Sequence, residues 1–97
     1  RPTSSAVPCA IVGTYEQLEP AGAICYQDKQ VGLFACCPCG CGEIMHLPFK
    51  GADGRGWTWD GDVPYPTLAP SIRRPSGCKW HGHLISGTWQ PSGDSGR

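Results

Sequence analysis

The chain has 97 residues, among them 14 glycines, 10 prolines and seven cysteines, and its eight basic and eight acidic residues cancel. This balance excludes an overall field that would steer the protein to nucleic acid or to an anionic membrane. No apolar run approaches the roughly 20 residues of a membrane span and no signal peptide opens the chain, so we expect a soluble protein without a membrane partner.

The frequent glycines and prolines exclude long helices and predict short elements in the first half of the chain. Residues 10–12 are expected to form a short strand and residues 14–18 one capped helical turn. Residues 24–26 and 32–36 are expected to form the two strands of a hairpin, joined by a polar turn at 27–30.

The second half continues the same pattern. Residues 43–49 predict a further strand. Residues 63–72 contain several prolines and are expected to be extended, edge-like or polyproline-like rather than a central strand. Residues 78–90 predict a last hairpin that turns at Ser86–Gly87.

The predicted fold is therefore a small β-rich domain of short antiparallel hairpins with long loops and little helix. It spans residues 1–97 as a single domain, with flexible ends at about 1–7 and 91–97. A domain of this length buries only about 60% of the surface of its unfolded chain, so a further stabilising tie is expected.

The cysteines predict what that tie is. The sequence CCPCGCG at 36–42 holds four of the seven cysteines, and the total is odd. A secreted disulfide framework carries an even number of spread cysteines, and adjacent cysteines are poorly placed to form a disulfide with each other. The clustering favours metal over disulfides and indicates a reducing, cytoplasmic location.

A second group of ligand residues follows at 78–81, where Cys78 and His81 have the C-x-x-H spacing. Two tight turns carrying thiolate and imidazole donors are typical of a zinc site. We expect the cofactor to be zinc, bound by Cys78 and His81 together with ligands from the pool Cys37, Cys39 and Cys41.

The remaining cysteines are expected to act as small apolar residues. Cys36 ends a predicted strand and should point into the core. Cys9 and Cys25 are expected to pack there too, with a disulfide or a second site as the alternative.

Several of these motifs together resemble a known family. They are CPCGCG at 37–42, PTLAPSI at 66–72, and Cys78-x-x-His81 ahead of a final hairpin, in a match that covers roughly residues 33–90. The pattern is similar to small bacterial and phage proteins of unknown function, some of them encoded beside ubiquitin-like conjugation genes. The resemblance implies a zinc-binding domain in a phage-defence or protein-modification context.

The favoured function is binding: a zinc-binding accessory or protein-interaction domain of bacterial or phage origin, whose metal is mainly structural and whose partner is another protein. No catalytic residue is assigned, because cysteine-rich sites are usually closed. The alternative from another class is a zinc-dependent hydrolase with an open metal position, using His83 or Glu43.

Two further features of the sequence could bind a partner. Arg73, Arg74 and Lys79 form a short basic patch, so a nucleic-acid-binding zinc module is a third, less favoured alternative. The four tryptophans are expected mainly to fill a core short of aliphatic residues rather than to form a binding face.

Overall fold

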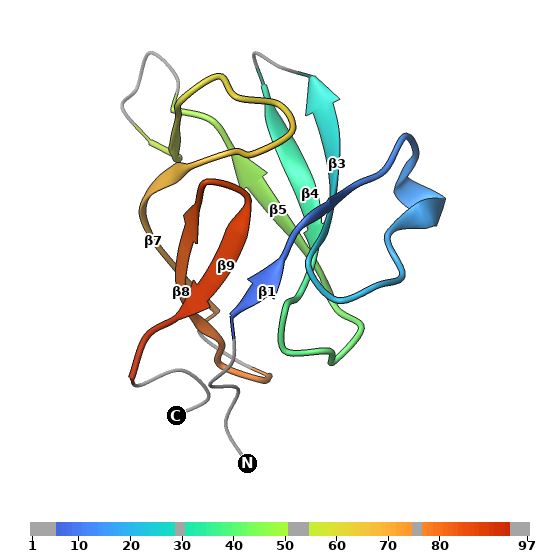
Figure 1. The fold of residues 1–97 in the computed structure, drawn as a ribbon, viewed down its shortest axis with the longest axis vertical. Helices are drawn as coiled ribbons and strands as arrows, with labels where there is room; N and C mark the ends of the chain where they lie inside the picture. The colour runs from blue at the N-terminus through green and yellow to red at the C-terminus, as the bar shows by residue number, and fades with distance from the viewer. Residues whose placement is uncertain (1–5, 29–30, 51–54, 75–76, 94–97) are drawn as a thin grey trace.

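The computed structural model describes residues 6–28, 31–50, 55–74 and 77–93. Within them the chain forms nine β-strands in two sheets and one 3-10 turn, η1, at Tyr15–Gln17. Most strand pairs are antiparallel neighbours, and the two sheets lie against each other (Figure 1). The predicted β-rich fold with antiparallel hairpins and little helix is confirmed. Within the described part of the chain, no helix has the length and apolarity that a membrane span requires.

The first sheet has four strands in the order β2-β3-β4-β5. They are β2 (Ala10–Ile11), β3 (Ala23–Asp28), β4 (Gly32–Cys36) and β5 (Ile44–Pro48). The predicted hairpin of β3 and β4 is confirmed, and β5 continues the sheet in antiparallel fashion, whereas β2 runs parallel to β3. Part of the predicted hairpin turn, residues 29–30, lies outside the described residues.

The second sheet has five strands in the order β1-β9-β8-β7-β6. The last hairpin turns at Ser86–Gly87 as predicted, and both residues have positive φ, 48° and 75°, as a tight two-residue hairpin turn requires. The strands of this sheet are β1 (Val7–Pro8), β6 (Thr58–Trp59), β7 (Leu68–Arg73), β8 (His81–Ile85) and β9 (Thr88–Pro91).

The core lies between the sheets and combines apolar side chains from both. Successive side chains of a strand point to opposite faces, so β4 directs Leu33 and Ala35 into this core and Phe34 and Cys36 to the outer face. A smaller apolar cluster forms on that outer face, near η1; its buried members are Leu18, Ala23, Cys25 and Cys36.

The tryptophans divide between core and half-buried positions. Trp80 and Trp89 are buried and meet edge to face, with ring centroids 5.7 Å apart. The indole N–H of Trp89 donates to the carbonyl of Gly22 at 2.9 Å, which links β9 to the segment that leads into β3. Trp57 and Trp59 are half-buried and pack against the same core. The expectation that tryptophans fill the core is confirmed for the first two.

The expectation for residues 63–72 was wrong in one respect. Leu68–Arg73 forms β7, which lies between β6 and β8 and is not an edge strand. The register between β7 and β8 shifts between Leu68 and Ile72, and Pro70 lies within this irregularity. A proline is tolerated at such a site because the ladder does not require its missing N–H.

The expected flexible ends fall largely on residues 1–5 and 94–97, outside the described residues. At their inner borders, Val7 pairs with Trp89 and Pro91 pairs with Gly82. The two ends of the described chain therefore meet in the second sheet, where β1 lies beside β9 (Figure 1).

Candidate functional site

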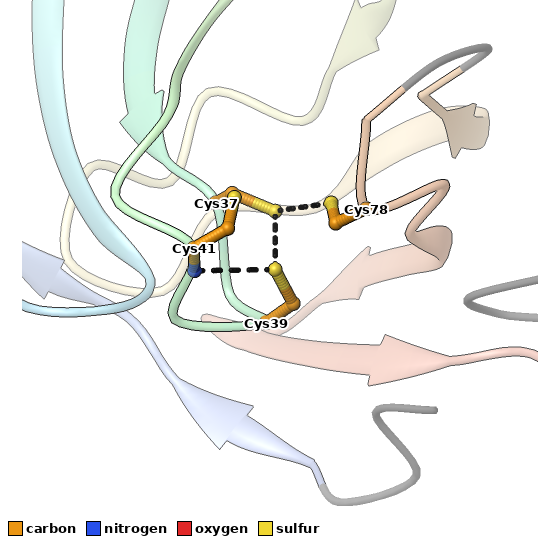
Figure 2. Close-up of side chains that lie close together, drawn as sticks. All are labelled: Cys37, Cys39, Cys41 and Cys78. Atoms are coloured by element: carbon orange, nitrogen blue, oxygen red, sulfur yellow. Dashed lines mark hydrogen bonds between the residues drawn. The ribbon is translucent and has the colours of Figure 1, made fainter. Parts of the chain in front are cut away.

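Four cysteine side chains converge where the two sheets meet. The sulfur atoms of Cys37, Cys39, Cys41 and Cys78 all lie within 4.8 Å of one another (Figure 2). The sulfur of Cys37 is 3.4 Å from that of Cys39 and 3.4 Å from that of Cys78. Four sulfurs arranged tetrahedrally around one ion, each about 2.3 Å from it, would lie about 3.8 Å apart. We refer to these four residues as the cysteine cluster.

The cluster is assembled from two connections, one from each sheet. Cys37, Cys39 and Cys41 lie in the turn between β4 and β5, and Cys78 lies between β7 and β8. Backbone hydrogen bonds close the first turn, where the N–H of Cys37 donates to the carbonyl of Glu43 at 2.8 Å. The backbone N–H of Cys41 also donates to the sulfur of Cys39 at 3.3 Å. A metal held there would join the two sheets.

Burial opposes ionisation of two thiols of the cluster, Cys37 and Cys39. Burial raises the pKa of Cys37 to about 11 and also raises that of Cys39. Burial works against ionisation of Cys78 too, but the backbone N–H of Trp80 and the neighbouring thiols outweigh it and lower its pKa. The thiols of Cys37 and Cys39 are therefore protonated at neutral pH, and a metal ion would displace their protons and stabilise the thiolates.

The chemistry of the donor set fits a soft or borderline metal ion. Four thiolates are ligands that suit zinc, copper(I) and iron, and they do not suit magnesium or calcium. All seven cysteines are free of disulfides, so each sulfur of the cluster has its full donor capacity. The cluster could thus hold a metal with four protein ligands.

The structure brings together four of the five predicted ligands. Cys37, Cys39, Cys41 and Cys78 form the cluster, whereas His81 is not a member of it. Cys36 is buried in the outer apolar cluster, as expected for a residue that ends a strand. Which of the predicted residues bind a metal stays a prediction. The two other cysteines also pack against apolar clusters; they are Cys9, half-buried, and Cys25, buried.

His81 instead contacts a serine. Its Nε2 atom lies 3.3 Å from Oγ of Ser71, and both residues are half-buried. Ser71 lies on β7 and His81 on β8, and the antiparallel register places Arg73 opposite His81. Because residues two apart on a strand share a face, Ser71 and Arg73 lie on the same side of the sheet as His81. We refer to Ser71 and His81 as the serine–histidine pair.

Arg73 contacts the other ring nitrogen of the histidine. One of its Nη atoms lies 3.3 Å from Nδ1 of His81. A guanidinium only donates hydrogen bonds, so Nδ1 accepts in this contact. The ring proton of neutral His81 then lies on Nε2 and is donated to the Ser71 hydroxyl. This arrangement differs from a catalytic triad, in which an acidic side chain accepts a hydrogen bond from Nδ1.

The serine–histidine pair was missed from the sequence. The two residues are separated by nine others and belong to no strand–turn–helix nucleophile motif. The only available signal was that both occur in the motifs that carry the family resemblance, PTLAPSI and C-x-x-H. The two side chains predicted for a hydrolase lie elsewhere. His83 is exposed on β8, and the carboxylate of Glu43 accepts a hydrogen bond from the guanidinium of Arg74 at 2.9 Å, forming an ion pair.

Comparison with protein-family models relates the chain to a bacterial family. No curated protein and no solved structure matches the chain. A family model described as "Bacterial ubiquitination-like system serine protease (BubE)" matches residues 11–92, which include the cysteine cluster and the serine–histidine pair. The expected relation to a bacterial family associated with ubiquitin-like conjugation is thus confirmed at that level. Because the match covers most of the chain, this protein belongs to the BubE family of bacterial ubiquitination-like systems.

Proposed function

We propose that this chain is a serine protease, with Ser71 as the nucleophile and His81 as its general base. The observation that carries the proposal is the 3.3 Å contact between Oγ of Ser71 and Nε2 of His81. A nucleophile and base within hydrogen-bond reach, often at a looser distance without substrate, are the minimum of this chemistry. The family's description as a serine protease of bacterial ubiquitination-like systems supports the same assignment.

The reaction would proceed in two steps. Oγ of Ser71 attacks the substrate carbonyl while Nε2 of His81 accepts the hydroxyl proton, and His81 then returns that proton to the leaving amine. Water, activated by the same imidazole, hydrolyses the acyl-enzyme. In the first step His81 must carry its proton on Nδ1, so Arg73 has to turn away from that atom before the serine is activated. Arg73 is exposed, so water can hydrate its guanidinium once this contact is broken.

The cysteine cluster would then have a structural role with zinc as its metal. Four thiolate ligands fill a tetrahedral zinc site and leave no open position for water. Cys78 lies three residues before His81, so a metal on the cluster would fix the start of β8 and with it the histidine. Zinc-bound thiolates suit a reducing, cytoplasmic location, and the partner would be another protein, the substrate.

The alternatives considered from the sequence have less support. A zinc-dependent hydrolase needs an open metal position and a free acid or base, whereas the cluster offers four sulfurs and Glu43 is ion-paired with Arg74. Nucleic-acid binding through Arg73 and Arg74 competes with their contacts to His81 and Glu43. A non-catalytic accessory or protein-interaction domain, in bacteria or phage, is the outcome if the serine proves unreactive.

Covalent labelling tests the proposal without knowledge of the substrate. The zinc-loaded protein is treated with a fluorophosphonate, which phosphonylates activated serines, and the adduct is located by mass spectrometry of peptides. We expect one adduct, on Ser71, and none in Ser71→Ala. The control is Ser86→Gly, which changes an exposed serine at a positive-φ turn position and should label like the unaltered protein. Unlabelled, folded, zinc-loaded protein would reject the protease and favour the interaction domain.

A further inference from the structure

Arg74 connects the cysteine cluster to the strand that bears the nucleophile. It is the first residue after β7, and its backbone N–H donates to the carbonyl of Trp80 at 2.8 Å. One Nη atom of its guanidinium lies 3.7 Å from the sulfur of Cys41, and the other lies 2.9 Å from a carboxylate oxygen of Glu43. The side chain therefore spans from the end of β7 to the turn between β4 and β5.

The two side chains of this ion pair differ in burial. The side chain of Arg74 is only 16% exposed, whereas that of Glu43 is 63% exposed. A carboxylate so well solvated contributes little to the stability of an ion pair, and it alone does not account for a largely buried guanidinium. The neighbouring sulfurs supply the missing reason, because a cation beside thiolates is favourable in a site with little water.

The charge of a metal-loaded cluster also favours a cationic side chain beside it. Four thiolates around a divalent cation carry a net charge of about −2, and side chains that donate hydrogen bonds to metal ligands commonly balance such charge and hold the ligands in place. Cys41 is the most exposed member of the cluster, so it is the one most open to water and competing reagents. Arg74 is the cationic side chain that contacts this sulfur among the described residues.

We propose that Arg74 balances the charge of the metal–thiolate centre and retains Cys41 as a ligand. The role rests on the proposed metal centre. The guanidinium donates to the sulfur of Cys41 and lowers its negative charge, which slows protonation and attack by electrophiles, while Glu43 orients the guanidinium from the solvent side.

The test measures zinc affinity and thiol reactivity rather than protease activity. Zinc-loaded protein is titrated with a chromophoric chelator, and Cys41 alkylation by iodoacetamide is followed by mass spectrometry. We expect Arg74→Gln to weaken zinc binding by about 10- to 100-fold, the range found for residues that hydrogen-bond to metal ligands, and to speed alkylation of Cys41. The control Glu43→Gln removes the charge of the ion pair but keeps a side-chain oxygen that can accept from Arg74, so the contact with the sulfur is retained and zinc affinity should change less than about 3-fold.

A double-mutant comparison separates this role from a general effect on the fold. In a Cys41→Ser background the sulfur contact is absent, so Arg74→Gln should weaken zinc binding much less than in the unaltered protein. An undiminished effect there, or an unchanged affinity in the single variant, would overturn the proposal. Failure of the unaltered protein to bind one zinc would overturn the metal centre itself.

A milder variant keeps the test decisive if Arg74→Gln does not fold. Arg74→Lys retains the charge but cannot bind the sulfur and Glu43 together, because an ammonium is a single, strongly hydrated point charge. We expect zinc affinity between that of the unaltered protein and of Cys41→Ser, with faster alkylation of Cys41. A zinc affinity and an alkylation rate equal to those of the unaltered protein would reject the role of Arg74.

Discussion

The cysteine cluster and the serine–histidine pair both draw on the segment from β7 to β8, where Cys78 lies between Ser71 and His81, but they are built differently. Three members of the cluster fall within five consecutive positions, 37–41, so most of its geometry belongs to one turn. The pair comes from two neighbouring strands, and its 3.3 Å contact depends on the register of β7 against β8. A site made by a turn is visible in local spacing, whereas a site made by strand register is not.

The largest effect is expected from disrupting the cysteine cluster. Removal of the metal with a chelator, or Cys78→Ser, should abolish the cooperative unfolding transition, because the cluster joins connections from both sheets. Structural zinc contributes binding free energy on the order of 10 kcal/mol to the folding of small domains. Thermal unfolding followed by circular dichroism, with zinc content measured in parallel, checks this.

The matched control for that prediction is another buried cysteine. Cys36→Ala alters a residue outside the cluster whose sulfur packs in the outer apolar cluster, so it should keep zinc and lower stability by only about 1 kcal/mol. If the metal-free protein still unfolds in a full cooperative transition, the metal is not structural. The cysteine cluster would then not stabilise the fold, and this difference from the serine–histidine pair would disappear.

The next largest effect is expected from a change in the serine–histidine pair. His81→Gln removes the base beside Ser71, so the rate of fluorophosphonate labelling should fall by about 100- to 10,000-fold. The zinc content should not change, because the imidazole is not a member of the cluster. His83→Gln, two residues further along β8 and exposed, is the control and should label normally. Loss of zinc from the first variant would instead identify His81 as a ligand, as the sequence predicted.

The smallest effect is expected from changes to the two buried tryptophans of the core. Trp89→Phe removes the indole N–H that donates to the carbonyl of Gly22, whereas the indole N–H of Trp80 has no partner among the described residues. Both tryptophans are buried and lose the same ring area. The free energy of unfolding should therefore fall further for Trp89→Phe than for Trp80→Phe, by about 1–2 kcal/mol. Equal losses in denaturant titrations would show that this hydrogen bond adds nothing.

The elements that sequence reasoning predicted well are local ones. The hairpin turn at Ser86–Gly87 and the strands β3 and β4 follow from turn residues and apolar runs that need no distant partner. The prediction failed for Leu68–Arg73, where prolines suggested an edge and the strand is central. The reason is the register irregularity around Pro70, which depends on how β8 lies beside it.

The sequence by itself determined the fold class and singled out the cysteines that converge in the cluster, because turn chemistry and cysteine spacing are properties of neighbouring residues. Only the tertiary structure decided that His81 faces Ser71 and that Arg74 reaches Cys41 and Glu43. Those contacts join residues from ten to more than thirty positions apart. Strand register and the packing of one sheet against the other determine them, and neither is encoded in the spacing of any short segment.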